Sequence, residues 1–334
     1  MNHSIIIPTK NRPLFINRIL HYYQLVGYNG QILIGDSSDT NELFELKQII
    51  EKYSTKLNIY FLHEKSKSAD EITVDLLNKI EKEFVSFLPD DDIILIDGIN
   101  HCINFLIQNM DYVAANGKSY YFTLDEMSEK HNGKIGYIYK YKMYYDESFD
   151  SRTRISNYFK NTDCLLMSVF RTKVFKECFS FSYLLPRYHR IFIYGELIPG
   201  IITLSKGKVK HLDVDYLIRQ GHDNNLWSKL DWYKFIFECN CQESNKIIKS
   251  LFSSFNLFDD FESEKILRRY FQDIIRFTFL KNSRLKYLEK YLGKMIATVV
   301  FHNVYKRIHY LIFRYKNKKL ISSIYFKKII HSYE

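Results

Sequence analysis

The chain has 334 residues, which is enough for one large domain with an appendage or for two ordinary domains. Hydrophobic residues make up 46% and charged residues 26%, so a packed core is available and gross disorder is excluded. Five cysteines without a Cys-x-x-Cys pair argue against a disulfide framework and fit a reducing compartment.

The N-terminal sequence leads directly into an apolar run, Ser4 to Pro8, without the basic region and long apolar stretch of a signal peptide. No stretch of about 18 uncharged apolar residues follows elsewhere, which argues against a transmembrane helix. We therefore predict a cytoplasmic protein, with peripheral binding to the inner face of the membrane as a further option.

The first 110 residues alternate short apolar runs with patterns of helical period. Strands are expected at Ile5–Ile7, Gln31–Ile34, Leu57–Leu62 and Phe84–Leu88. Helices are expected at Pro13–Val26, Thr40–Tyr53, Ala69–Lys82 and Ile93–Gln108. This alternation predicts an α/β fold with a mainly parallel sheet flanked by helices. In such sheets ligands bind outside the carboxyl ends of the strands.

The pattern is more mixed between residues 111 and 221, and it turns helical after that point. Further strands are expected at Tyr112–Ala115, Ser119–Phe122, Leu165–Arg171 and Val209–Ile218, with a hairpin or mobile loop at Gly133–Met143. Helices are expected at Thr172–Cys178, Leu197–Ser205, Leu226–Phe255, Glu262–Leu280, Ser283–Tyr315 and Leu320–His331. We predict a domain over 1–221, with halves 1–110 and 111–221, and a helical basic C-terminal extension over 222–334.

Three consecutive carboxylates, Asp90, Asp91 and Asp92, follow the fourth expected strand directly. Crowded like charges raise one another's pKa, so the arrangement is costly without a cation. Hard divalent ions such as Mg²⁺ or Mn²⁺ prefer carboxylate oxygens and often bind substrate phosphates as well. The alternative is a solvated turn that caps the following helix.

Two further polar segments follow expected strands. The first is Pro8-Thr9-Lys10-Asn11-Arg12, which leads into a helix start that favours anions. It contains neither G-x-G-x-x-G nor G-x-x-x-x-G-K-[ST]. The second is Gly35-Asp36-Ser37-Ser38, whose acid can accept hydrogen bonds from a base or ribose, or can simply cap the next helix.

In this order and spacing, the three segments resemble the family-2-like glycosyltransferases of the GT-A fold, over about residues 3–220. The resemblance implies that Thr9 and Asn11 line the nucleotide pocket and that Asp36 contacts the base. It implies that Asp90 and Asp92 bracket the metal and the diphosphate. Many relatives carry two acids after the second strand, whereas Gly35 occupies the first of these positions here. The nucleotide-sugar site predicted in this way comprises Pro8, Thr9, Asn11, Arg12, Asp36, Asp90, Asp91, Arg219 and His222.

Arg219 and His222 belong to that set because cationic side chains after a late strand can offset the charge of a diphosphate. They can equally be ordinary surface residues. The family's catalytic base is usually an acid in the second half of the domain, and Glu196 is the candidate here, although the usual Asp partner is replaced by Leu197. Asp213 and Asp215 are lesser candidates, and a helix first-turn acid is the structural alternative for Glu196.

The expected activity is therefore that of a metal-dependent glycosyltransferase of the hexosyltransferase type. Mn²⁺ or Mg²⁺ at Asp90 and Asp92 would hold a nucleotide-diphosphate sugar, and Glu196 would deprotonate an acceptor hydroxyl. The resemblance implies inversion at the anomeric carbon and a glycan or lipid-linked acceptor in surface polysaccharide synthesis. A sugar-phosphate nucleotidyltransferase is disfavoured because the first loop has no glycine.

The residues 301–334 carry +7 of the net charge of +10. Aromatic and basic side chains alternate there, with apolar residues at helical spacing. This pattern indicates an amphipathic helix that binds an anionic membrane surface, or one that packs on the domain with its charges in solvent. A non-catalytic protein that uses this tail on lipid or nucleic acid is the alternative from another class, and nucleic acid is the less favoured partner.

Overall fold

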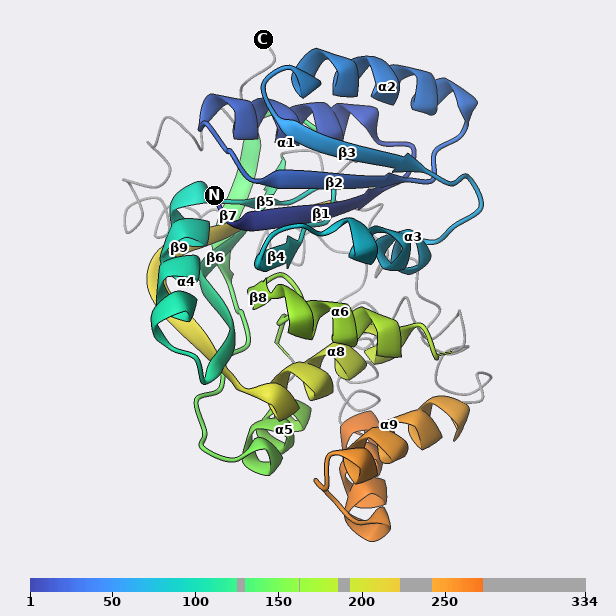
Figure 1. Ribbon diagram of the computed structural model, residues 1–334, viewed down its shortest axis with the longest axis vertical. Helices are drawn as coiled ribbons and strands as arrows, with labels where there is room; N and C mark the ends of the chain where they lie inside the picture. The colour runs from blue at the N-terminus through green and yellow to red at the C-terminus, as the bar shows by residue number, and fades with distance from the viewer. Residues whose placement is uncertain (125–129, 162, 186–192, 223–241, 273–334) are drawn as a thin grey trace, which may run out of the picture.

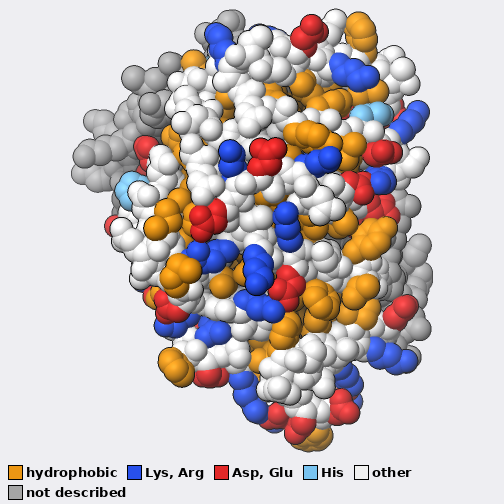
Figure 2. Space-filling view, viewed as in Figure 1, with side chains coloured by type: hydrophobic (Ala, Val, Ile, Leu, Met, Phe, Trp, Pro, Cys, Tyr) orange, Lys and Arg blue, Asp and Glu red, His pale blue; other side chains and the backbone are white. Residues whose placement is uncertain are grey.

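The structure is a computed structural model, and it describes residues 1–124, 130–161, 163–185, 193–222 and 242–272. The expected helices beyond residue 272, the tail 301–334 and most of the expected helix Leu226–Phe255 lie outside these residues. Among the described helices, none has both the length and the apolar character that crossing a bilayer requires. Over the face shown in Figure 2, charged side chains of both signs are interspersed with hydrophobic ones.

The first half forms a parallel sheet with strand order β3-β2-β1-β4. The strands are β1 (His3–Thr9), β2 (Gln31–Asp36), β3 (Asn58–His63) and β4 (Phe84–Phe87). The connecting elements are α1 (Pro13–Leu25), α2 (Thr40–Ser54), α3 (Ala69–Leu76) and the 3₁₀ turn η1 (Leu77–Lys79). Every strand and helix expected here is present, and the third helix is shorter than predicted.

The apolar side chains of β1 point alternately to the two faces of this sheet, which explains why helices cover both faces (Figure 1). Ile5 and Ile7 point into one core, where they pack with α1 residues such as Ile16 and Leu20. Ile6 points the other way, into a second core with Leu76 at the end of α3. Because successive side chains of a strand face opposite sides, an uninterrupted apolar run is what a strand buried on both faces requires.

The second half continues the same sheet in the order β4-β8-β6-β9-β5, with β7 paired to β6. Its strands are β5 (Ile93–Ile94), β6 (Tyr112–Leu124), β7 (Ile135–Tyr141), β8 (Val169–Arg171) and β9 (Lys208–Gly221). Its helices are α4 (Ile96–Gln108), α5 (Ser151–Lys160), α6 (Thr172–Ser182) and α8 (Ile193–Lys206). The GT-A-like α/β architecture predicted from the sequence is confirmed.

Two details of the second half differ from the sequence-based expectation, and a third decides between two expected alternatives. Ile93 and Ile94 were expected to begin a helix, but they form β5 and pair with Ile218 and Leu217 of β9. The two strands expected within 112–122 form one strand, β6. It is bulged between Gly117 and Ser119, and the bulge interrupts the period-2 alternation that would have indicated a single strand. The segment 133–143 supplies β7, so the hairpin alternative holds there.

The described part of the C-terminal region packs on the second core. It comprises α9 (Gln242–Ser254) and a further helical segment over 260–272. Ile248, Leu251 and Phe252 of α9 are buried in the same cluster as α8 residues. The apolar face of α9 is therefore used against the domain (Figure 1).

Candidate active site

Four strand ends meet at one edge of the sheet. β4 is antiparallel to β8, β8 is antiparallel to β6, and β6 is parallel to β9. As a result β9 runs in the same direction as β1, β2 and β4, and its carboxyl end lies at the same edge as theirs. The loops after β1, β2 and β4 and the last residues of β9 supply the side chains of the site.

Asp90 is held by the loop that follows β1. Thr9 Oγ1 donates a hydrogen bond of 2.8 Å to Asp90 Oδ2, and Arg12 Nη1 donates one of 2.7 Å to Asp90 Oδ1. Asp90 is 6% exposed and Thr9 is likewise buried. Both oxygens of this carboxylate are therefore paired with protein donors.

Asp91 and Asp92 are held by the end of β9. His222 Nε2 lies 2.9 Å from Asp91 Oδ2, and Arg219 Nε donates to Asp92 Oδ2 at 2.8 Å. The backbone N–H of Gln220 donates to Asp92 Oδ1 at 3.1 Å. Arg219 and His222, which were predicted to face the diphosphate, thus lie directly against the acidic cluster.

Burial dominates the protonation of the cluster. Loss of hydration raises the pKa of Asp90 to about 6, helped by the neighbouring Asp91 charge and opposed by Arg12. It raises the pKa of Asp92 to about 7, although Arg219 opposes it. Burial acts in the same direction on Asp91, but the hydrogen bond from His222 and the charge of Arg12 outweigh it, so that this pKa is lowered.

A divalent metal at these carboxylates would have to compete with protein donors for their oxygens. Each oxygen of Asp90 and Asp92 already accepts a hydrogen bond from Thr9, Arg12, Arg219 or Gln220. Among the residues that the structure describes, no group of three or more His, Cys, Asp or Glu side chains is placed to hold a metal ion. Cations from arginine occupy the positions that the sequence assigned to Mn²⁺ or Mg²⁺.

Asp36 is fully buried at the end of β2 and does not cap α2, whose N-cap is Asp39. Its Oδ1 accepts from the backbone and hydroxyl of Ser38, and its Oδ2 lies 2.7 Å from His63 Nδ1. The His63 side chain is 24% exposed, whereas that of Asp36 is inaccessible. His63, which the sequence analysis missed, is the accessible member of this pair.

The β1–α1 loop is braced against the β2–α2 loop. Asn11 has a φ of 56°, and its backbone N–H donates to the hydroxyl of Ser38 at 2.7 Å. The Asn11 side chain exchanges two hydrogen bonds with Asp39, at 2.9 and 2.8 Å. Pro8 lies buried in β1, opposite Gly35 of β2. Asn11 therefore fixes the shape of the loop, while Thr9 and Arg12 reach the acids.

Gly35 stands where the resemblance described above would place an acid, and its neighbourhood explains the glycine. A Cβ at this position would lie 2.9 Å from Cγ1 of Ile72 in α3, which is closer than side-chain carbons approach. Any larger side chain at Gly35 would push α3 off the sheet. The position is thus used for helix packing rather than for contact with a ligand.

Glu196 lies in the first turn of α8. Burial raises the pKa of Glu196, and the positive charge of Arg219 opposes the rise. The hydroxyl of Tyr158 donates to the Glu196 backbone oxygen at 3.2 Å. The lesser candidates have other partners: Asp213 is exposed and paired with Lys118, and Asp215 accepts from the Tyr120 hydroxyl at 2.5 Å.

Arg18 and Gln220 complete the site and were not singled out in the sequence. Arg18 Nη2 donates to the backbone oxygen of Asp91 at 2.8 Å, and Arg18 Nη1 donates to Gln220 Oε1. Both side chains are buried. An arginine inside an apolar helix pattern such as that of α1 is a detectable signal, because a buried charge needs a partner.

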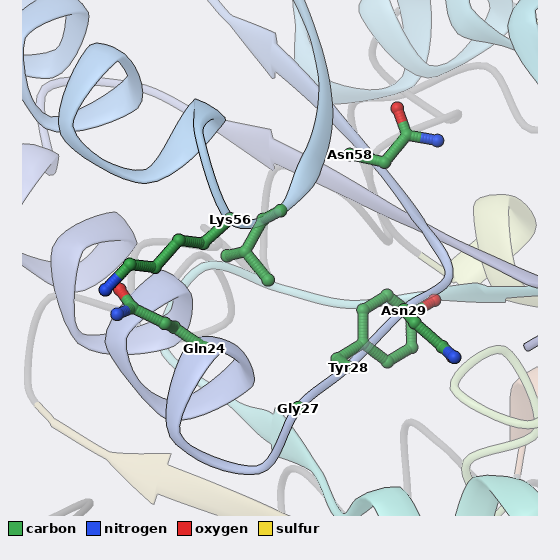
Figure 3. Close-up of a pocket in the computed structure, with 7 residues that line it drawn as sticks. Gln24, Gly27, Tyr28, Asn29, Lys56 and Asn58 are labelled. Atoms are coloured by element: carbon green, nitrogen blue, oxygen red, sulfur yellow. The ribbon is translucent and has the colours of Figure 1, made fainter.

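The cavity shown in Figure 3 lies away from this site. Its lining comes from the end of α1, the loop before β2 and the segment that leads into β3, including Gln24, Tyr28, Asn29 and Lys56. These residues are at the amino ends of the strands, opposite the edge that holds the acidic cluster. We assign no role in the chemistry to this cavity.

The order and direction of the strands define a GT-A-like α/β fold. The chain is similar to the crystal structure of S. aureus TarS, with a TM-score of 0.50 and 14% identity, over 81% of this chain and 43% of that chain. It is similar to TarS 1–349 in complex with UDP, with a TM-score of 0.50 and 16% identity, over 86% and 75% of the two chains. The chain thus spans less than half the length of full TarS.

No family model and no curated protein matches the sequence. At identities this low, the likeness to TarS shows the fold, and the activity has to be argued from the site.

The raised pKa values of Asp90 and Asp92 predict a specific dependence of stability on pH. The folded protein keeps these two protons at pH values where the unfolded chain, with an ordinary pKa of 3.8, has lost them. Their stabilising contribution is therefore complete below about pH 4 and is lost as the pH rises through about 7. Between about pH 5 and 7, the unfolding free energy of the wild type should fall more steeply than that of Asp92→Asn, by up to about 1.4 kcal/mol per pH unit.

Urea denaturation at several pH values measures this difference. Parallel profiles for the wild type and Asp92→Asn would show that Asp92 titrates in its ordinary range.

Proposed function

We propose that this protein is a glycosyltransferase that moves a sugar from a nucleotide-diphosphate sugar to an acceptor hydroxyl. The observation that carries the proposal is the meeting of the Thr9–Arg12 loop, the acidic cluster and Arg219 at the carboxyl edge of the sheet, with Glu196 within electrostatic reach of Arg219. This edge is where α/β sheets bind ligands.

The charges of the site suit a diphosphate. Three carboxylates are accompanied by Arg12, Arg18 and Arg219, with His222 as a further partner. Guanidinium groups bind phosphate oxygens through paired N–H donors. The side chains of Arg12 and Arg219 are 19% and 24% exposed, so each remains open to a ligand while it holds its aspartate.

The nucleotide would then extend toward β2 and β3. Asp36 was predicted to contact the base, but its oxygens are taken by Ser38 and His63. In the proposed complex Asp36 orients His63, and the exposed side of the imidazole meets the nucleoside. A buried carboxylate that fixes a histidine ring is a common way to position such a contact.

Glu196 is proposed as the general base. A base works best when its pKa is close to the working pH, and burial moves the pKa of Glu196 upward in that direction. It would take the proton of the acceptor hydroxyl as that oxygen attacks the anomeric carbon, while the arginines stabilise the departing nucleotide diphosphate. Inversion of configuration follows from such a single displacement.

Binding of Mn²⁺ or Mg²⁺ at Asp90 and Asp92 stays a prediction. It requires Arg12 and Arg219 to give up their hydrogen bonds to these carboxylates, and no step above depends on it. The acceptor is proposed to be a surface glycan or a lipid-linked precursor, and TarS in complex with UDP makes a uridine nucleotide the first donor to examine. Association of the tail 301–334 with an anionic membrane is likewise a proposal.

A thermal-shift screen of UDP-, GDP-, CMP- and dTDP-linked sugars, each with Mn²⁺ or with EDTA, tests the donor site. At about 100 times Kd, a true donor should raise the Tm by about 5 °C or more, because it binds only the folded state. A rise in Tm that disappears in EDTA would support a metal at the acidic cluster. A rise in Tm that persists in EDTA would support donor binding by the arginines alone. Folded protein without any shift would overturn the proposal and favour a non-catalytic basic protein.

Replacement of the proposed base separates catalysis from binding. Glu196→Gln should lower the release of free nucleotide from the donor by about 100-fold or more, because the base is lost. Its thermal shift with the donor should match that of the wild type. Glu177→Gln is the control, since Glu177 is a partly buried glutamate of α6 that pairs with Lys206 of α8. An unchanged rate in Glu196→Gln would remove Glu196 from this role.

The nucleoside contact is tested at His63. His63→Ala should weaken binding of the responding nucleotide by about tenfold, as expected when a positioned polar contact is removed. Lys65→Ala is the control, because this nearby side chain is 63% exposed and pairs only weakly, at 3.7 Å, with Asp39. Isothermal titration calorimetry measures both. Equal affinities in the two variants would exclude His63 from the nucleotide site.

A further inference from the structure

Four tyrosines form a row on one face of the β6–β7 hairpin: Tyr121, Tyr137, Tyr139 and Tyr141, here called the tyrosine row. In the antiparallel register Tyr121 lies opposite Tyr139, Thr123 opposite Tyr137, and Ser119 opposite Tyr141. All of these side chains therefore point to the same side of the sheet. The other side of β7 holds Ile138, which is fully buried in the core.

The rings of the row pack against one another. The centroids of Tyr121 and Tyr139 are 4.8 Å apart at an interplanar angle of 31°, and those of Tyr137 and Tyr139 are 5.8 Å apart at 16°. Tyr139 is 37% exposed, and Tyr121 and Tyr137 are partly buried. Since the rings cover one another's faces, the row offers preformed, rigid aromatic edges and hydroxyl groups at an accessible position.

The row begins at the proposed active site. The guanidinium carbon of Arg219 lies 4.7 Å from the centroid of the Tyr141 ring, and Arg219 is the partner of Tyr121 in the β6–β9 register. Burial raises the pKa of Tyr141, and the nearby charges of Glu196 and Asp92 act in the same direction. Tyr141 thus packs against Arg219, which holds Asp92 of the acidic cluster.

Gly221 of β9 leaves space for Tyr121 of the row. A Cβ added to Gly221 would meet the Tyr121 hydroxyl at 1.8 Å and its ring at 2.1 Å. Tyr121 therefore occupies the space beside the last residues of β9, immediately next to Gln220 and His222. The glycine permits this close approach, which holds the row against the acidic cluster.

We propose that the tyrosine row is the acceptor subsite and that it binds an uncharged saccharide chain, whose reactive hydroxyl it delivers to Glu196. This inference rests on the proposed glycosyltransferase function. The nucleotide side of the site lies toward β2 and β3, and the row extends from the acidic cluster in the other direction along the sheet. A sugar acceptor has to approach from that direction in order to reach Glu196 and the donor together.

The chemistry of the row matches a neutral sugar. Tyrosine combines an apolar ring with a hydroxyl and loses little conformational entropy on binding, which suits a ligand with C–H surfaces and many hydroxyls. Arg219 is the one charged side chain among the described positions that share this face. These positions lie within 119–123 of β6, 135–141 of β7 and 219–221 of β9. Arg219 is already bonded to Asp92.

Titration of the full chain with maltohexaose and chitohexaose, in the presence of UDP, tests the subsite by saturation-transfer NMR. At least one of these neutral oligosaccharides should bind the wild type. Tyr139→Ala should weaken this binding by about tenfold, because it removes the most accessible ring of the row. Tyr139→Phe, which keeps the ring, should lose less affinity. The UDP-induced thermal shift should be the same in all variants.

Tyr145→Ala is the matched control, because Tyr145 is an exposed tyrosine outside the row that stacks on His211, with centroids 5.3 Å apart. It should bind the oligosaccharide as the wild type does. Equal binding by Tyr139→Ala, or binding of neither oligosaccharide by the wild type, would overturn the proposal. If UDP raises the Tm but neither oligosaccharide binds, the proposed subsite is wrong and the glycosyltransferase proposal stands. If an oligosaccharide binds but no nucleotide sugar raises the Tm, the glycosyltransferase proposal is wrong.

Discussion

The structure of the site depends on how three adjacent, buried carboxylates are compensated. Asp90, Asp91 and Asp92 follow β4 at a place where water cannot hydrate them fully, and their mutual repulsion adds to that cost. Arg12 from the start of α1 and Arg219 from the end of β9 supply the opposing charges. Removal of Arg12 or Arg219 would leave a buried aspartate without its guanidinium partner, so the loops are tied to the sheet electrostatically.

The course of the chain makes this compensation possible. The first four strands are parallel, and β8 lies between β4 and β6 in the sheet and is antiparallel to both of these neighbours. That reversal returns β6 and β9 to the direction of β1 and β4. Had β9 run the other way, Arg219, Gln220 and His222 would lie at the opposite edge, and the acidic cluster would have lost three of its partners.

The same topology explains which parts of the site could be predicted from the sequence. Thr9, Arg12, Asp36 and the three aspartates each follow an apolar strand, so their placement at one edge needs only strand periodicity and the rule for parallel sheets. The contact between Arg18 and Gln220 joins residues 202 positions apart, and no local pattern specifies it. The pairing of Asp36 with His63 depends on the β2–β3 register. The hydrogen bonds of Arg12 to Asp90 and of Arg219 to Asp92 depend on how the first loop and the end of β9 meet, which no local pattern specifies.

Arg219 connects the parts of the site that would otherwise be separate. It bonds Asp92, lies over the ring of Tyr141, and lowers the pKa of Glu196 against the effect of burial. Its own pKa is raised well above the ordinary value, because the nearby anionic groups outweigh the effect of its burial, and it therefore stays charged. A change at Arg219 would alter the acidic cluster, the proposed base and the tyrosine row at once. Arg12, by contrast, contacts Asp90 and Asp91, at 2.7 and 3.5 Å, so the two arginines neutralise different members of the same cluster.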